Sequence, residues 1–410
     1  MEKHCILLLC LGLILVRSRP SSIPSFQQDL VRNKSDSPCH SCECWTGNQL
    51  LYHSGGRKSW EWINSHLAKV SIIITSFNEE PDLLLKTLNS IWVNTSVNLI
   101  HEVILVDDCS SRTDLFSVIP KHPLVRLMRN PTRLGLIRSR MVGARAAVAE
   151  ILVFLDSHVE TTSHWLEPLL ARLLNAKNHT GNACRSDQPM ESQVDCLQSA
   201  AERLVVSPII YDISNPNELD DRPVWGGFTW NLTFRWEYMK AANRSDHILQ
   251  PWASPAISGG IYATWRKGFF DLGGYDEEMD IWGAENVELS LRTWLCSGRM
   301  EIIPCSRVGH FYRSVHPYNF PQGKEYTVLR NRKRTALVWF VHGESQDRGQ
   351  YYLQNFYKNS PTAININAGG LSERRKIAQD LNCKPFTWYL DNIYPSLRDE
   401  TDIFYLWSYR

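Results

Sequence analysis

The sequence lacks several features that mark large functional classes. Its 410 residues carry 44 Lys and Arg against 43 Asp and Glu, and a net charge of +1 gives no general attraction to nucleic acid, which is not an expected partner. No Walker or GxGxxG phosphate loop and no GxSxG elbow occurs, so kinases, dehydrogenases and hydrolases of those types are not expected. No apolar run reaches 18 residues, and 43% hydrophobic residues exclude disorder.

The N-terminus carries an export signal. Residues 6–16 form an unbroken apolar run between charged flanks, shorter than the roughly 20 residues of a full membrane span. The segment after it, Arg-Ser-Arg-Pro, lacks the small residues of a cleavage site. Residues 1–19 are therefore expected to be an uncleaved signal-anchor, which would hold the protein in a membrane, or a cleaved signal peptide. Glycan acceptor sequons, which agree with a secretory-pathway protein, begin at Asn33, Asn94, Asn178, Asn231 and Asn243.

The cysteines are expected to form disulfides in that compartment. Two of the 11 Cys lie within residues 1–19, and the odd number that remains leaves at least one unpaired. Cys39, Cys42 and Cys44 form a cluster. A metal knuckle is the alternative for this cluster, but no second ligand pair with suitable spacing follows it, so disulfide partners are favoured.

The chain divides into an irregular N-terminal segment and an α/β domain. Residues 20–69, polar and without periodicity up to Asn64, are predicted to be a stem, and residues 70–400 a catalytic domain. This alternation of strands with helices predicts a doubly wound, parallel sheet, and residues 175–203 are predicted to be a surface insertion. Strands are predicted at 70–75, 102–107, 125–128, 151–155 and 300–304, the last followed by a turn at 305–309, and helices at 82–91, 136–149 and 288–296.

Polar side chains follow three of the predicted strands. Thr75, Asp108 and Asp156 fall at carboxyl ends, where parallel α/β sheets bind ligands. Asp156 and His158 can point the same way from an extended loop, and His310 can supply a third metal ligand. A carboxylate with imidazoles suits a borderline ion such as Mn²⁺ that also holds phosphate oxygens. The simpler alternative is a capping aspartate with surface or core histidines.

Further polar donors lie close to the last of these histidines. Arg313, His316 and Tyr318 follow within eight residues, and this density of cationic and hydroxyl groups fits a pyrophosphate. Arg133 is similar in kind, although a solvated arginine is the simpler interpretation. Glu285 can hold a sugar hydroxyl, or it can be a helix N-terminal acid favoured by the helix dipole.

These motifs occur in the same order in the polypeptide N-acetylgalactosaminyltransferases, a family that the chain resembles from about residue 70 to about residue 397. The resemblance implies a GT-A nucleotide-diphospho-sugar transferase fold, with a Rossmann-like, mostly parallel central sheet and flanking helices. It also implies Mn²⁺ and UDP-GalNAc. The matching segments are Ser-Ile-Ile-Ile-Thr at 71–75, Val-Asp-Asp at 106–108, Leu-Asp-Ser-His at 155–158, His-Trp-Leu-Glu-Pro-Leu-Leu at 164–170, Gly-Gly-Phe at 226–228, Ser-Gly-Gly at 258–260, Met-Asp-Ile-Trp-Gly-Ala-Glu-Asn at 279–286, Ile-Ile-Pro-Cys-Ser-Arg-Val-Gly-His at 302–310 and Cys-Lys-Pro-Phe-Thr-Trp-Tyr-Leu at 383–390.

The implied reaction is transfer of GalNAc from UDP-GalNAc to Ser or Thr hydroxyls of polypeptides with retained anomeric configuration, which starts mucin-type O-glycans. The implied location is the Golgi membrane, as a single-pass type II protein with a lumenal catalytic domain, or secretion if the signal is cleaved. Residues 70–158 are expected to form the nucleotide-binding half and residues 159–400 the acceptor and sugar half. The C-terminal lectin domain usual in the family is not expected after residue 397.

The resemblance also implies roles for single residues. Those similar to the Mn²⁺ ligands of the family are Asp156, His158 and His310. Those at positions that hold uridine, ribose or sugar are Thr75, Asp108, Arg133 and Ser157. Those that match the donor site and the loop that closes over UDP are Trp282, Arg313, His316 and Tyr318. The sugar-binding pair is Glu285 and Asn286, which with Arg313 are expected to be catalytic. The implied disulfides join Cys296 to Cys383, and Cys305 to Cys39, Cys42 or Cys44.

Three departures from the family pattern bear on activity. Thr229 stands where the family usually has a carboxylate, Ala284 where it has a glycine, and Leu337 where it has a glutamate. They favour an alternative in which the protein is a weak or inactive homologue that acts as a binding or regulatory partner in the Golgi. A transferase with a different UDP-sugar donor is a further alternative.

Overall fold

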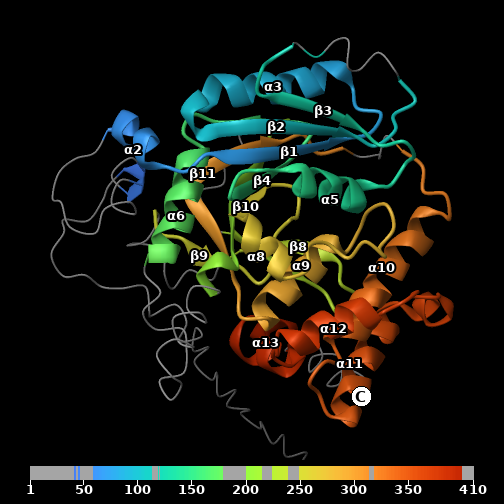
Figure 1. Ribbon diagram of the computed structural model, residues 1–410. Coiled ribbons are helices and arrows are strands. Elements are labelled where there is room, and N and C mark those ends of the chain that lie inside the picture. The colour runs from blue at the N-terminus through green and yellow to red at the C-terminus, as the bar shows by residue number, and fades with distance from the viewer. Residues whose placement is uncertain are drawn as a thin grey trace, which may run out of the picture.

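The computed structural model describes residues 41–42, 45–46, 59–112, 119, 121–178, 200–214, 224–238, 249–313 and 318–398. Within them one large sheet carries helices on both faces (Figure 1). The predicted signal, most of the predicted stem, His316 and residues 179–199 of the predicted insertion lie outside the described residues. In the described part of the chain, no helix combines the length and apolar character needed to cross a membrane.

The central sheet has nine strands. Its order is β3-β2-β1-β4-β10-β6-β11-β5, and β9 pairs with β11. The pairs β1–β2, β1–β4, β2–β3 and β6–β11 are parallel, whereas β10, β5 and β9 run antiparallel to their partners. The strands are β1 (Val70–Ser76), β2 (Ile100–Asp107), β3 (Val125–Arg129), β4 (Ile151–Asp156), β5 (Val159–Thr161), β6 (Leu204–Asp212), β9 (Trp252–Ala253), β10 (Tyr262–Trp265) and β11 (Arg299–His310). A separate antiparallel hairpin joins β7 (Val224–Phe228) to β8 (Phe234–Tyr238).

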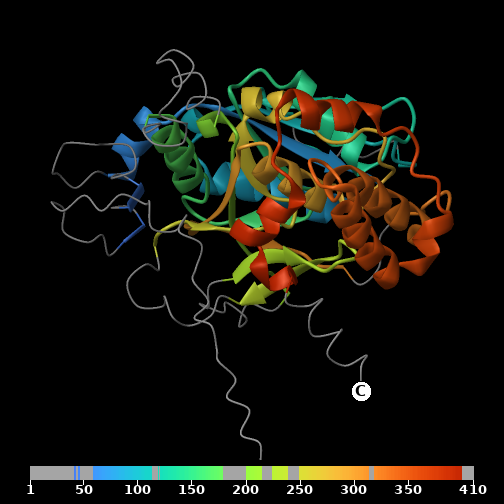
Figure 2. The same cartoon turned by 90° about the horizontal axis from the view of Figure 1, so that it is seen from below.

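The helices form two layers and a C-terminal group. Helices α10 to α13 gather beside the sheet in both views (Figures 1 and 2), where α10 and α13 contact α9. The helices are α2 (Trp60–His66), α3 (Pro81–Asn94), α5 (Leu136–Ala146), α6 (Leu166–Asn178), α8 (Arg266–Asp271), α9 (Glu285–Leu295), α10 (Lys324–Trp339), α11 (Gln346–Asn359), α12 (Ser372–Asp380) and α13 (Phe386–Asn392), with short 3-10 turns η2 (Val97–Leu99) and η5 (Pro361–Asn365).

The apolar pattern of β1 explains the layering. Its side chains alternate between faces: Ile73 belongs to the hydrophobic cluster beneath α5, and Ile72 and Ile74 belong to the cluster beneath α3 and α6. Helix α5 approaches β1 closely at Gly143, where a Cβ would lie 2.5 Å from the Cγ2 of Ile73. The predicted α/β fold with helices on both faces of a sheet is therefore confirmed.

Strand β11 is longer than predicted. The prediction of a turn at 305–309 is wrong, because the strand continues to His310 with a register shift between Ile303 and Arg307. The later part pairs with β6 on one side and with β5 on the other, so its backbone groups find partners in the sheet. This tertiary pairing overrides the local signals of Ser306 and Gly309.

The end of the predicted stem is structured. The prediction of irregular chain up to Asn64 is wrong at its end, where residues 60–66 form α2. Cys42 forms a disulfide with Cys305 of β11, which ties the segment to the central sheet, and Trp45 is buried. The implied pair between Cys296 and Cys383 is also present. The remaining cysteine with a described position, Cys109, is free.

A buried ion pair links α6 to β11 and predicts a pH-dependent stability. Glu301 accepts hydrogen bonds from Arg172 Nε at 2.7 Å and from Arg299. Burial raises the pKa of Glu301, but the two guanidinium groups outweigh it and lower the pKa to about 2. Since this folded-state pKa lies below the ordinary value of 4.5, the stabilisation is present above pH 4.5 and is lost as the pH falls toward 2.

We expect Glu301→Gln to lower the free energy of unfolding by about 3 to 5 kcal/mol at pH 7, because Arg172 keeps a buried charge without its partner. The difference from wild type should shrink between pH 4.5 and pH 2. Urea unfolding at several pH values measures both effects. Glu277→Gln, which removes an exposed partner of Arg145, serves as the control and should cost less than about 1 kcal/mol. A difference between wild type and Glu301→Gln that does not change with pH would contradict the assignment.

Candidate functional site

A cavity of about 470 Å³ lies at the carboxyl ends of β1, β2 and β4. Ten of the predicted site residues line it: Thr75, Asp108, Arg133, Asp156, Ser157, His158, Trp282, His310, Arg313 and Tyr318. The structure thus brings together residues from opposite ends of the domain at the place where α/β sheets bind ligands. Within the described part of the chain, the buried hydroxyl of Thr75 has no hydrogen-bond partner.

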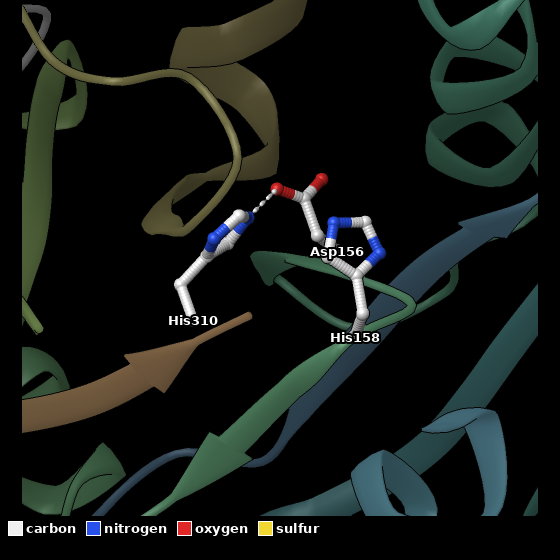
Figure 3. Close-up of side chains that lie close together, drawn as sticks. All are labelled: Asp156, His158 and His310. Carbon is white, nitrogen blue, oxygen red and sulfur yellow. Dashed lines mark ion pairs between the residues drawn. The ribbon is translucent and has the colours of Figure 1, made fainter. Parts of the chain in front are cut away.

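Asp156, His158 and His310 form a compact group of ligand atoms (Figure 3). One atom from each lies within 4.8 Å of the others, and His310 Nε2 is 3.4 Å from Asp156 Oδ2. Strand pairing produces this proximity, because His310 is in register with Val159 and the backbone of Phe311 donates to His158 O at 3.1 Å. The three residues predicted as metal ligands are therefore neighbours.

The donor set fits a divalent ion. The Nδ1 of His158 is 3.0 Å from Glu79 Oε2, which leaves Nε2 of His158 for a ligand. Among the residues that the structure describes, none is hydrogen-bonded to the buried Nδ1 of His310. Gly260 packs so closely on Asp156 that a Cβ there would lie 2.1 Å from Oδ2, so the carboxylate is fixed in place. One carboxylate and two imidazoles suit a borderline ion such as Mn²⁺.

Glu79 orients this group, and sequence reasoning missed it. Its side chain is 3% exposed and accepts from Ser157 Oγ at 2.6 Å and from Arg313. Burial raises the pKa of Glu79, but hydrogen bonds from His158 and Ser157 outweigh burial and lower it. In this structure the hydroxyl of Ser157 therefore helps to hold the carboxylate of Glu79. The signal that could have found Glu79 is its position in the loop that follows β1, four residues after Thr75.

Arg140 is the second residue that sequence reasoning missed. It lies on α5, is 2% exposed, and places Nη2 2.7 Å from Asp156 Oδ1 and Nη1 3.9 Å from Glu285 Oε1. Burial raises the pKa of Asp156, but His310 and Arg140 outweigh it and hold the pKa well below its usual range. For Glu285 the burial effect exceeds the effect of Arg140, and its pKa is raised. The signal in the sequence that could have found Arg140 is its position on a helix face that is otherwise apolar.

Glu285 and Asn286 lie behind the cavity wall. Both are buried at the start of α9, and neither lines the cavity. Glu285 Oε2 accepts from Gly283 N at 2.7 Å, and Asn286 Nδ2 donates to Ile257 O at 2.9 Å. The pair therefore holds the two backbone segments that carry Trp282 and Ser258 to the wall. Direct contact of this pair with a sugar remains a prediction.

Arg133 belongs to an aromatic cluster. Its guanidinium lies 4.3 Å from the ring centre of Phe77 and 5.4 Å from that of Tyr318, and Nη1 donates to Asn319 O at 2.6 Å. Asp108 fixes the loop on both sides of Arg133, since its carboxylate accepts from three loop nitrogens, those of the Asn130 side chain and of the backbone at 134 and 135. Asp108 thus positions the loop rather than presenting a free carboxylate.

Two sequence families match parts of the chain. Glycosyl transferase family 2 matches residues 71–189, and the N-terminal domain of galactosyltransferase matches residues 241–317. Human polypeptide N-acetylgalactosaminyltransferase 16 is 42% identical over 340 residues, covering 82% of this chain and 55% of the relative. Over this 82% of its length, the chain is similar to the polypeptide N-acetylgalactosaminyltransferases. Polypeptide N-acetylgalactosaminyltransferase 4 of Caenorhabditis elegans is 38% identical over 334 residues, covering 80% and 51%. The chain spans about half the length of these curated family members.

A solved structure supports the fold. The crystal structure of GalNAc-T7 with UDP, GalNAc and Mn²⁺ is similar with a TM-score of 0.63 and 27% identity, covering 81% of this chain and 58% of that chain. The predicted GT-A fold is confirmed.

None of the three departures from the family pattern belongs to the metal-ligand group. Thr229 is in the β7–β8 turn, where its hydroxyl donates to Asn231, and Leu337 is half-buried on α10. Neither lines the cavity. Ala284 precedes α9 and has a left-handed backbone, with φ of 68°. Its neighbour Gly283 also has positive φ, 107°, and so does Ile281, 51°. The glycine that the family usually has at this position is therefore explained by the left-handed backbone, which glycine adopts at no steric cost.

We expect Ala284→Gly to raise the free energy of unfolding by up to about 1 kcal/mol. A left-handed conformation costs an L-residue roughly 1 to 2 kcal/mol, and the greater freedom of glycine in the unfolded chain offsets part of the gain. Urea unfolding measures the change. Ala336→Gly, at a buried position inside α10, is the matched control and should destabilise the protein by about 1 kcal/mol. Equal destabilisation by both variants would contradict the role of backbone strain at Ala284.

Arg140→Met should lower the free energy of unfolding by about 3 to 5 kcal/mol, because the buried Glu285 and the half-buried Asp156 lose their shared cation. Arg145→Met is the matched control on the same helix, since Arg145 forms an exposed pair with Glu277 and should contribute less than about 1 kcal/mol. Urea unfolding of both variants at pH 7 gives the comparison. Similar losses for the two variants would show that the buried charges do not depend on Arg140.

Proposed function

We propose that the protein transfers N-acetylgalactosamine from UDP-GalNAc to Ser or Thr hydroxyls of polypeptides, with retained anomeric configuration. The observation that carries the proposal is the group of Asp156, His158 and His310 within a cavity at the carboxyl ends of the sheet. Similarity to these transferases supports it, as does the similar fold of GalNAc-T7, which was crystallised with UDP, GalNAc and Mn²⁺.

The metal-ligand group is assigned to Mn²⁺. Asp156, His158 and His310 would hold the ion, and Glu79 would keep the ring of His158 oriented. A bound divalent ion supplies positive charge that stabilises the diphosphate of the UDP leaving group. Arg140 keeps Asp156 ionised, which is the form that binds a cation.

Arg313 is proposed as the residue that stabilises the leaving group. Its guanidinium lines the cavity and is held by Glu79, next to His158. In the transfer, the bond between the anomeric carbon and the UDP oxygen breaks, and the acceptor hydroxyl forms its bond on the same face. The negative charge that develops on the diphosphate then lies near Arg313. The hydroxyl proton passes to the departing phosphate oxygen.

The remaining predicted residues are proposed to shape the donor site. Thr75 offers a hydroxyl to which no described residue is hydrogen-bonded, and Arg133 with Tyr318 presents a cationic and aromatic surface. Trp282 lines the same cavity. His316 is proposed as a further donor-site residue from the sequence pattern. Glu285 and Asn286 are proposed to act on the sugar through the segments that they hold.

The location is proposed from the sequence. Residues 1–19 are proposed to be the signal-anchor of a single-pass type II protein in the Golgi membrane, with residues 70–400 in the lumen. Residues 20–69 are proposed as the stem. The acceptor is a Ser- or Thr-containing polypeptide, and no nucleic acid takes part.

The full chain, purified from membranes or medium of mammalian cells, should transfer GalNAc from UDP-GalNAc to a mixed Ser/Thr peptide library with Mn²⁺. The double variant Asp156→Ala, His158→Ala should lose turnover, because two metal ligands are removed. Mass spectrometry of the peptides measures transfer. With UDP and Mn²⁺ at 100 times their Kd, wild type should gain about 2.7 kcal/mol of stability, which raises its Tm, and the double variant should not.

Three other results would contradict the proposed reaction. Folded protein that binds UDP and Mn²⁺ without turnover would support the inactive homologue. Transfer from UDP-GlcNAc or UDP-galactose in preference to UDP-GalNAc would support a different donor. An unchanged Tm for wild type, with no turnover from any donor, would remove the transferase proposal.

A further inference from the structure

We propose that Asn231, on the turn of the β7–β8 hairpin, is the attachment site of an N-linked glycan. The segment Asn231-Leu-Thr233 has the acceptor pattern for this modification. The proposal rests on the secretory location given under the proposed function, and it concerns a modification of the protein itself rather than its reaction with a donor sugar.

The turn presents Asn231 on its outer side. Side chains alternate along it: Trp230 and Leu232 are 4% and 1% exposed, whereas Asn231 is half-buried and Thr233 is exposed. The backbone is fixed by bonds from Thr229 N to Thr233 O at 3.0 Å and from Leu232 N to Thr229 O at 2.7 Å. Trp230 Nε1 donates to a backbone carbonyl at residue 397 at 2.9 Å, which anchors the inner side of the turn.

In the described part of the chain, the side-chain hydrogen bonds of Asn231 all involve its amide oxygen. Oδ1 accepts from Thr233 Oγ1 at 2.6 Å, from Thr233 N at 3.2 Å and from Thr229 Oγ1 at 2.5 Å. Among the residues with described positions, none accepts a hydrogen bond from Nδ2 of Asn231. The amide oxygen is therefore held in place, and a sugar on the amide nitrogen would break none of these three hydrogen bonds.

The modification joins Nδ2 to the anomeric carbon of an oligosaccharide. The co-substrate is a lipid-linked oligosaccharide diphosphate of the secretory pathway. The bond between the anomeric carbon and the diphosphate oxygen breaks, the diphosphate leaves with the electron pair, and the proton that the amide nitrogen loses passes to solvent. No oxidant or reductant is needed.

Asn94 provides a contrast within the same chain. Its Nδ2 donates to Thr161 O at 2.7 Å, and its Oδ1 accepts from Ser163 Oγ at 3.2 Å. This amide joins the end of α3 to the sheet at β5, so a sugar on its nitrogen would have to fit between them. Both asparagines have the acceptor pattern, but only Asn231 has a nitrogen that the fold leaves unused.

The test is site mapping on the full chain made in mammalian cells. The folded protein is treated with peptide N-glycosidase in water labelled with oxygen-18, which converts a glycosylated asparagine to a labelled aspartate, and its peptides are read by mass spectrometry. We expect the label at position 231 and unmodified Asn94. An unlabelled peptide at 231 overturns the proposal, whether or not other sequons carry glycans.

Three variants add a second measurement. Thr233→Ala removes the acceptor pattern and should lose the gel shift of one glycan, whereas Thr233→Ser keeps the pattern and should keep the shift. Asn94→Gln should leave the shift unchanged. A shift that survives Thr233→Ala overturns the proposal. The mapping requires no transferase activity, so a glycan at Asn231 without turnover would contradict the proposed reaction alone.

Discussion

The site depends on two carboxylates, one buried and one half-buried, that share one cation. Asp156 and Glu285 come from segments that lie far apart in the sequence, and Arg140 reaches both from α5. Burial favours the neutral form of each carboxyl group, and a single guanidinium cannot offset it equally for both. Asp156 gains a second partner in His310 and stays ionised, whereas Glu285 has its pKa raised. The carboxylate that faces the cavity is thus the one suited to a metal ion.

The position of the Arg140 guanidinium depends in turn on helix packing. Helix α5 lies against β1 at Gly143, where the space beside Ile73 excludes a larger side chain. A shift of this helix would move Arg140 away from Asp156. The histidines depend on the sheet in a similar way, because the pairing of β11 with β5 sets His310 beside His158. The geometry of the site therefore depends on the packing of the core.

The sequence was sufficient for the parts of the site that follow local rules. Strands that end in polar residues predicted the cavity edge, and the pattern around Asp156 predicted the metal-ligand group. Glu79 and Arg140 were missed because their roles depend on contacts between distant segments, and an isolated charge in a loop or helix gives no sign of its partner. The course of β11 after residue 304 was missed because pairing with neighbours on both sides outweighs local turn signals. Pairing of Cys305 with Cys42 likewise required the fold.

The departures from the family pattern act on backbone and surface, not on the ligand atoms. Thr229 satisfies its hydroxyl within a hairpin turn, and Leu337 lies on a helix outside the cavity wall. Ala284 differs, because its left-handed backbone directly precedes Glu285 and follows the segment that carries Trp282. Its effect on the site is therefore conformational: a residue that resists this backbone raises the energy of the segment, while the chemistry of Asp156 and the histidines is untouched.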